Sequence, residues 1–319
     1  MTTIIENRRE TGARGVRERV ADHPLLTFFV LACGLSWLAW LPYVLSQNGL
    51  GVWDFRFPTV LGTSQLSGVL PGALLGPLGS AFLVTALADG RPGLRRWVGR
   101  LLRWRVSWKW YALALVGVPA LVVLSGLPFS GGVVHAPSTL ALVSIVPGLV
   151  LQLLTTGLAE EPGWRDFALP RLQQRFTPLG AAAVLGPVWA LWHMPLFLSD
   201  WGGWPNAHWT DVVWFAGFCI TFNVVMAWVF NRTGESLPVA MLLHVGVNNT
   251  VSLLWTDIYP TIPANQLMFG LFAMAAVGAT VIVIATRGRL GYPGPAQREH
   301  TTAPADDAAH SVDFGDGHR

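Results

Sequence analysis

Charged residues are scarce in this sequence. Only 12% of its 319 residues are Asp, Glu, Lys or Arg, which is about half the share in an ordinary soluble protein. Hydrophobic residues make up 52% of the chain, and the mean hydropathy is +0.46. This composition argues against a disordered chain, a nucleic-acid-binding protein and an ordinary cytosolic enzyme, so we expect no nucleic-acid partner.

Cysteine is also nearly absent. The chain has two cysteines, Cys33 and Cys219, and each stands alone in an apolar stretch. A disulfide framework or a cysteine metal site needs several cysteines at regular spacings, so the sequence gives no sign of either. The H-E-x-x-H, P-loop and G-x-G-x-x-G motifs are missing too, which argues against a soluble zinc protease and a nucleotide-dependent enzyme.

Long runs without any charged residue organise the chain. Seven such runs have at least 20 residues, and a helix needs roughly 20 apolar residues to cross a membrane. The run 110–159 is broken at 128–137 by prolines and glycines, so it holds two spans. We therefore predict an all-α, polytopic membrane bundle of about eight transmembrane helices. The predicted spans are 25–46, 66–88, 110–127, 139–165, 179–198, 212–230, 237–256 and 266–286.

The basic residues indicate the orientation of this bundle. All but one of the 21 basic residues lie in the N-terminal lead, in the tail or in alternate connections. The positive-inside rule then places both termini in the cytoplasm, and an even number of spans agrees. We expect a multi-pass protein of the cell membrane, surrounded by the lipid bilayer. Its predicted parts are a lead (1–23), N-terminal helices (24–138) with a basic loop (89–109), a core (139–256), a last helix (257–290) and a disordered cytoplasmic tail (291–319).

Three of the predicted spans carry nearly all the ionisable side chains that fall within the membrane. Such groups are costly in lipid, so they are functional candidates. The candidates are Glu160, Glu161 and Arg165 at the end of the span 139–165, His193 in the span 179–198, and His244 and Asn248 in the span 237–256.

The spacing of these residues predicts how they face one another. Glu161 and Arg165 are four residues apart, the favourable order for an ion pair on a helix. Glu160 then points about 100° away, free to face a cavity. Pro162 weakens the helix at this point, which suits a wet pocket. Counted along their helices, Glu160 and His193 share a depth, so we predict one pocket reached from the cytoplasmic side.

Two kinds of water-activating chemistry suit these groups. In the first, a glutamate acts as general base, a histidine orients the water, and a second histidine and an amide donate to the developing oxyanion. In the second, Glu160, His193 and His244 bind zinc and leave one position open for water. Both lead to hydrolysis, and the residues alone leave the choice open.

The order and placement of these pieces resemble the CPBP intramembrane metalloprotease family, which includes the CAAX prenyl endopeptidases and bacteriocin-processing or immunity proteins. The matching core is about residues 140–255. Trp189 stands where the family usually has phenylalanine. Asp166 stands where a glycine is common, so we expect it to compete for Arg165. The family's E-E-x-x-x-R, F-x-x-x-H and H-x-x-x-N motifs stand here as Glu160-Glu161-x-x-x-Arg165, Trp189-x-x-x-His193 and His244-x-x-x-Asn248.

The resemblance implies a multi-helix membrane protein with a cavity that opens toward the cytoplasm. It gives each candidate a role: Glu160 is the general base with His193, His244 and Asn248 bind the oxyanion, and Glu161 and Arg165 shape the site. If a metal is used, the ligands it implies are His193 and His244.

The leading hypothesis is an intramembrane endopeptidase that cleaves a membrane-associated or lipidated peptide or protein. A non-catalytic immunity factor or scaffold of the same fold is the first alternative, and a proton-coupled transporter with a Glu/His relay is the second. Transporters commonly show inverted repeats with paired broken helices, and the sequence has one weakened helix and no visible repeat. An enzyme and a scaffold differ in whether Glu160→Gln abolishes function.

Overall fold

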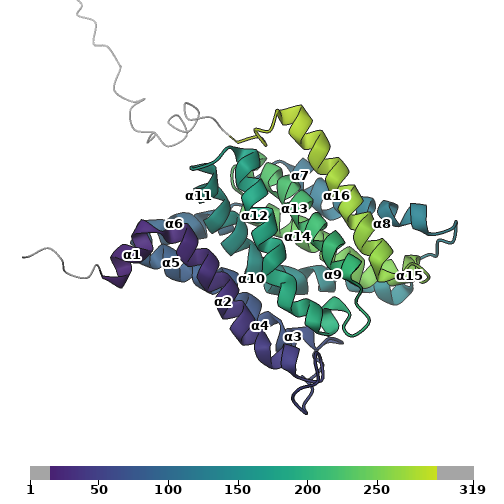
Figure 1. Ribbon diagram of the computed structural model, residues 1–319. Coiled ribbons are helices and arrows are strands. Elements are labelled where there is room, and N and C mark those ends of the chain that lie inside the picture. The colour runs from purple at the N-terminus through teal and green to yellow at the C-terminus, as the bar shows by residue number, and fades with distance from the viewer. Residues whose placement is uncertain (1–14, 293–319) are drawn as a thin grey trace, which may run out of the picture.

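The computed structural model describes residues 15–292, and that part of the chain is a bundle of helices without a strand (Figure 1). Eight of its helical segments are long and apolar enough to cross a membrane, which confirms the predicted polytopic bundle. Most of the predicted lead and tail falls on residues 1–14 and 293–319, which lie outside the described residues. The orientation of the bundle in the membrane stays a prediction.

Most boundaries of the eight spans agree with the predicted ones to within a few residues, because the length of an apolar run limits the helix that can sit in lipid. Several spans contain a π-helical or 3₁₀ segment, labelled η. The spans are α2 (Pro24–Leu45); α4 (Leu70–Ala73), η1 (Leu74–Gly79) and α5 (Ser80–Ala88); α7 (Trp108–Ala112), η2 (Leu113–Gly117), α8 (Val118–Gly126) and η3 (Leu127–Phe129); α9 (Thr139–Gln152), η4 (Leu153–Gly157), α10 (Leu158–Glu161), η5 (Pro162–Ala168) and α11 (Leu169–Gln173); α12 (Pro178–His193) and η6 (Met194–Leu198); α13 (Trp209–Arg232); α14 (Leu237–Thr250), η8 (Val251–Trp255) and α15 (Thr256–Ile258); and α16 (Ala264–Thr286).

Four shorter helices lie outside these spans. Three of them are α1 (Val16–Asp22) before α2, α3 (Gln65–Gly68) before α4, and η7 (Asp200–Gly202) after η6. The fourth, α6 (Gly90–Leu101), is amphipathic and joins the second span to the third. The second span ends directly before α6 and the third begins shortly after it, so this amphipathic helix lies at one face of the membrane.

The fourth span continues to Gln173, past its predicted end at residue 165. Its course is helical throughout but changes to wide π turns at η4 and η5. Pro162 opens η5 and has no N–H to donate, so the regular α-helical bonding stops there. Short π-helical segments of this kind are frequent at functional sites. Here the wide turn follows directly on Glu160 and Glu161.

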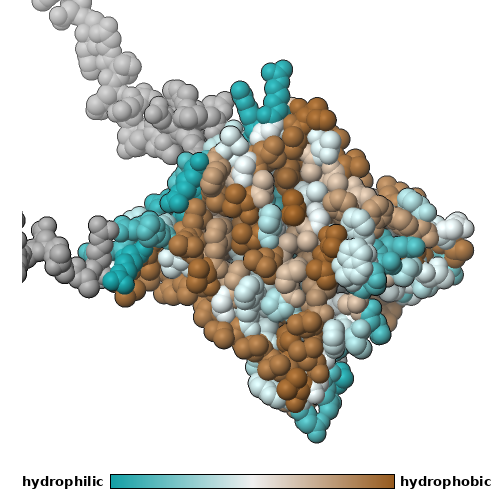
Figure 2. All heavy atoms as spheres, viewed as in Figure 1, coloured by the Kyte–Doolittle hydropathy of each residue, from teal (hydrophilic) through white to brown (hydrophobic). Residues whose placement is uncertain are grey.

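The seventh span is the centre of the bundle. Nearly every residue of α14 is buried, and α14 packs against α8, α9, α10 and α13. The outer helices instead expose apolar side chains, such as Leu140 at 74% and Ile284 at 72%. Figure 2 shows brown, hydrophobic residues along much of the face that carries α2 and α16. An apolar exterior around a buried central helix is the arrangement expected in lipid.

The first span supports the end of α12. The indole of Trp192 donates to the Ser36 hydroxyl at 2.7 Å, and Trp37 donates to the carbonyl of Trp192 at 2.9 Å. A side chain on Gly72 would meet the Trp40 indole at 2.3 Å, so the glycine lets the second span approach α2 closely. The N-terminal helices thereby fix the turn of α12 that carries His193.

Candidate active site

The structure brings together all six residues singled out from the sequence. Three helical segments that meet inside the bundle supply them. Five of the six are buried, and Asn248 is half-buried. Glu160 and Glu161 end α10, Arg165 lies in η5, His193 ends α12, and His244 and Asn248 lie one turn apart on α14.

Glu161 is held by two partners. One of its carboxylate oxygens lies 3.1 Å from Nε of Arg165, with both side chains fully buried, so the predicted pairing is confirmed. Its other oxygen accepts a hydrogen bond from Nδ1 of His244 at 2.8 Å. Arg165 also donates to the amide oxygen of Asn223, whose amide nitrogen donates to the Ala182 carbonyl at 2.7 Å. Glu161 and Arg165 therefore form a buried, charge-matched pair, and Glu161 orients His244.

Glu160 lies in a different environment. Among the ion pairs of the described residues, none joins Glu160 to an arginine or a lysine. Its Oε2 accepts a hydrogen bond from the indole nitrogen of Trp189 at 2.9 Å and lies 4.0 Å from Nε2 of His193. With the residue only 5% exposed, this carboxylate is buried beside a histidine without a basic partner of its own.

The hydrogen bond of His193 fixes which of its ring nitrogens carries the proton. Nδ1 lies 2.9 Å from the carbonyl oxygen of Trp189, and a carbonyl can only accept. Nδ1 therefore carries the hydrogen, and Nε2 faces Glu160 as an acceptor. The 4.0 Å between Nε2 and the carboxylate is too long for a direct hydrogen bond. Two acceptors at this separation suit one water that donates to both.

His244 presents its second nitrogen to Asn248. Because Nδ1 donates to the Glu161 carboxylate, Nε2 is the nitrogen left for a substrate, and it lies 3.5 Å from the Asn248 amide nitrogen. The amide can donate two hydrogen bonds, and a proton on Nε2 makes the ring a second donor. This pair can stabilise a negatively charged oxygen.

Aromatic rings enclose the site. His193 stacks against Trp201 with ring centres 5.4 Å apart and meets Trp192 at 4.5 Å and Phe215 at 5.0 Å. Trp189 was noted in the sequence only as the aromatic residue of the second motif, and its hydrogen bond to Glu160 was not anticipated. Its position in the second motif, one turn before His193, was the available signal.

Asn223 was missed as well, although an amide in an otherwise apolar span was a visible signal. Asp166 does not compete for Arg165, contrary to our expectation. It pairs with Arg100 of α6 at 2.6 Å, because the next residue along a helix points about 100° away from its neighbour.

The zinc alternative uses Glu160, His193 and His244. Within residues 15–292, no group of three or more His, Cys, Asp or Glu side chains is arranged to hold a metal ion. Nδ1 of each histidine is engaged by the protein, which leaves only the Nε2 atoms. As placed, the three side chains do not fit the close tetrahedral set that zinc requires.

Two comparisons with known proteins match this part of the chain. Residues 142–250 match the family model described as type II CAAX prenyl endopeptidase Rce1-like, and that range contains all six candidate residues. A CAAX prenyl protease 2 from Methanococcus maripaludis is 24% identical over 197 residues, which cover 58% of this chain and 72% of the relative.

Proposed function

Because residues 142–250 belong to the CAAX protease family, we propose that this intramembrane endopeptidase cleaves a membrane-associated or lipidated protein with water activated at Glu160. The observation that carries the proposal is the position of Glu160. It is a buried carboxylate without an arginine partner, 4.0 Å from the acceptor nitrogen of His193. An ionisable group of this kind in a membrane span is a functional candidate by default.

Glu160 and His193 act on the water. A water that donates to Oε2 of Glu160 and to Nε2 of His193 has its lone pairs free to attack a carbonyl carbon. Glu160 takes a proton as the bond forms, which is general-base catalysis worth about 10²–10⁴ in rate. The same carboxyl group then gives that proton to the leaving nitrogen, so the peptide bond breaks and the nitrogen departs as a neutral amine.

His244 and Asn248 stabilise the oxygen of the attacked carbonyl. Negative charge develops there as water adds, and donors already aimed at that position lower the barrier. Glu161 and Arg165 take no direct part. They hold His244 in one orientation, because a carboxylate that accepts a hydrogen bond from one ring nitrogen fixes the direction of the other.

No step of this proposal uses a metal, because the side chains as placed do not form a three-ligand group. We expect the purified protein to keep its hydrolysis rate within about twofold after treatment with a chelator. A rate that is lost in chelator and restored by zinc would favour the alternative in which Glu160, His193 and His244 are ligands.

The orientation and the membrane are proposals as well. We place both termini in the cytoplasm of a cell that carries this protein in its cell membrane, because the basic residues gather on one side. Of the seven basic residues of the stretch 90–109, Arg100 alone is partly buried, and the other six are exposed. A cysteine-accessibility assay on α6 and on the loop after α2 would report which side each faces.

The test of function compares peptide termini in membranes from cells with wild type and with Glu160→Gln, at equal membrane abundance. New termini that disappear in the variant support the peptidase and name its substrate. Identical termini together with a phenotype that survives the substitution would favour a non-catalytic immunity or scaffold role. A phenotype that follows the proton gradient would favour a transporter.

A further inference from the structure

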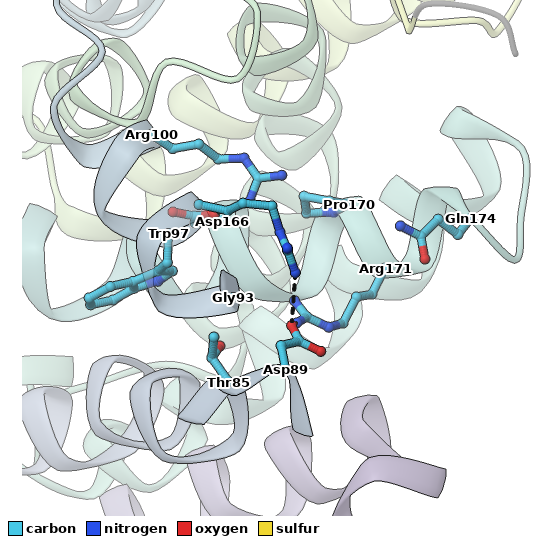
Figure 3. A pocket seen from close by; sticks show the side chains of 10 residues that line it. Thr85, Asp89, Gly93, Trp97, Arg100, Asp166, Pro170, Arg171 and Gln174 are labelled. Atoms are coloured by element: carbon cyan, nitrogen blue, oxygen red, sulfur yellow. Dashed lines mark hydrogen bonds and ion pairs between the residues drawn. The ribbon is translucent and has the colours of Figure 1, made fainter. Parts of the chain in front are cut away.

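A polar cavity of about 290 Å³ lies apart from the candidate active site (Figure 3). It opens between the end of α5, the helix α6 and the end of the fourth span. None of the six candidate catalytic residues lines it. Among its lining residues are three arginines, Arg96, Arg100 and Arg171, and two carboxylates, Asp89 and Asp166.

The arginines of this cavity are not equally compensated. Arg100 pairs with both Asp166 and Glu235 at 2.6 Å. Burial lowers the pKa of Arg100, but these two carboxylates more than offset it and raise that pKa above its usual value. Arg100 is therefore a cation with two anions.

Arg96 and Arg171 instead share a single carboxylate. Arg171 donates to Asp89, and Arg96 lies 3.8 Å from the same oxygen with 62% of its side chain exposed. Figure 3 shows Arg171 directed toward Asp89 inside the cavity. Together with Arg100 these arginines face three carboxylates, so the local charge is balanced, but Arg96 is exposed and only loosely paired, and its N–H groups are placed to bind a further anion. Guanidinium groups bind phosphate and carboxylate oxygens through paired hydrogen bonds.

The position of α6 indicates where that anion comes from. The helix joins two membrane spans at one face of the bilayer, and Leu102, Trp104 and Trp108 just after it are 67%, 47% and 72% exposed. Exposed tryptophans and leucine beside basic residues are typical of a segment that lies at the lipid headgroups. Basic pockets between membrane helices at that level bind the headgroups of anionic lipids.

We propose that this cavity binds the phosphate of an anionic lipid headgroup between Arg96 and Arg171. Arg95 provides a matched control, because it is an exposed arginine on the same helix and does not line the cavity. The experiment is a native mass spectrometry titration of the full chain in neutral detergent. Phosphatidylglycerol, phosphatidylcholine and inorganic phosphate are the three ligands.

We expect saturable binding of phosphatidylglycerol, weakened about tenfold by Arg96→Gln and less than about threefold by Arg95→Gln, since a charge-assisted hydrogen bond is lost only in the first. Equal weakening in both variants would overturn the proposal in favour of a diffuse basic surface. Phosphatidylcholine binding as tightly would overturn it too. Inorganic phosphate that binds as tightly as the lipid would overturn the lipid assignment.

A second inference rests on a different observation, the contacts of Trp189. This residue is 2% exposed and contacts four of the six candidate residues, which are Glu160, His193, His244 and Arg165. Its indole donates to Glu160, and its carbonyl accepts from His193. Its ring meets His244 edge-on at 5.4 Å and lies 5.2 Å from the guanidinium carbon of Arg165.

The geometry points to Trp189 as a positioning residue for the general base, an inference that rests on the proposed function. Its N–H occupies one side of Oε2 and fixes the plane of the Glu160 carboxylate beside His193. Phenylalanine keeps a ring at this position and removes the donor, so Trp189→Phe isolates the hydrogen bond. Trp40→Phe is the matched control, because Trp40 is fully buried and donates to the Val69 carbonyl at 2.7 Å, away from Glu160.

We expect Trp189→Phe to lower kcat about tenfold with KM within about twofold, as for loss of a hydrogen bond to a charged group. Trp40→Phe should leave both within about twofold. In a Glu160→Gln background, Trp189→Phe should have no further effect, because the partner is already gone. Equal rates for the two tryptophan variants, or an undiminished effect in that background, would overturn the inference. A wild type without hydrolysis would overturn the proposed function itself.

Discussion

Two clusters of charged residues meet at the fourth span, and they differ in how their carboxylates are paired. The interfacial cluster contains Asp89, Asp166 and Glu235, and each of them forms an ion pair with an arginine. The interior cluster contains Glu161, which is paired with Arg165, and Glu160, which is not. Among the carboxylates of the two clusters, Glu160 is the one without an arginine partner.

The difference distinguishes the paired carboxylates, which stabilise the fold, from Glu160, which is available for proton transfer. A buried carboxylate without a cation is costly, and pairing is the ordinary remedy. Glu161 is paired with Arg165 one turn further along the same span, and Asp166 is paired with Arg100 of α6. Glu160 instead has an indole donor and a histidine acceptor, partners that leave the carboxylate able to exchange a proton.

The largest effect on stability should come from Arg165→Met. This change leaves Glu161 buried without its cation, and loss of one partner of a buried pair costs about 3–5 kcal/mol. We expect less folded protein by fluorescence-detected size exclusion and a lower midpoint of thermal unfolding. A variant as stable as wild type would show that Arg165 does not compensate Glu161.

A smaller effect should follow from Asn248→Ala, and it should fall on rate instead of folding. Removal of one donor to a developing oxyanion lowers kcat by about 10²–10³-fold. Asn249→Ala is the control, because Asn249 donates to the Ile145 carbonyl at 3.0 Å, away from His244. The measurement is the hydrolysis rate per folded protein. Equal losses of activity in the two variants would contradict the assignment of Asn248.

The smallest effect should come from Glu235→Gln in the interfacial cluster. Arg100 keeps Asp166 as its partner, and the Glu235 side chain is 26% exposed to solvent. A partly exposed pair contributes about 1 kcal/mol or less, so we expect a small fall in the unfolding midpoint and an unchanged hydrolysis rate. A large loss of rate would place the interfacial cluster in the chemistry.

The spans and the six candidate residues could be predicted because lipid imposes strict rules on a sequence. Apolar runs must reach across the membrane, and ionisable groups inside them need a reason to be there. The pair Glu161 and Arg165 could also be predicted, since both partners lie on one helix. These inferences need only local spacing.

The partners that join distant helices could not be predicted in the same way. Asp166 meets Arg100, and Arg165 meets Asn223, only because the helices carrying them pack together. The hydrogen bond from Trp189 to Glu160 likewise depends on the crossing of α10 and α12. Spacing along one helix gives the direction of a side chain but not the neighbour that it will meet.

The most direct test is a side-by-side measurement of hydrolysis rates per folded protein for Glu160→Gln and Asp166→Asn. Both substitutions remove one buried carboxylate charge from the same span. We predict a loss of about 10³-fold for Glu160→Gln, within the range for a general base, and a rate within about threefold of wild type for Asp166→Asn. Equal losses in the two variants, or a Glu160→Gln protein that still hydrolyses its substrate, would contradict the account.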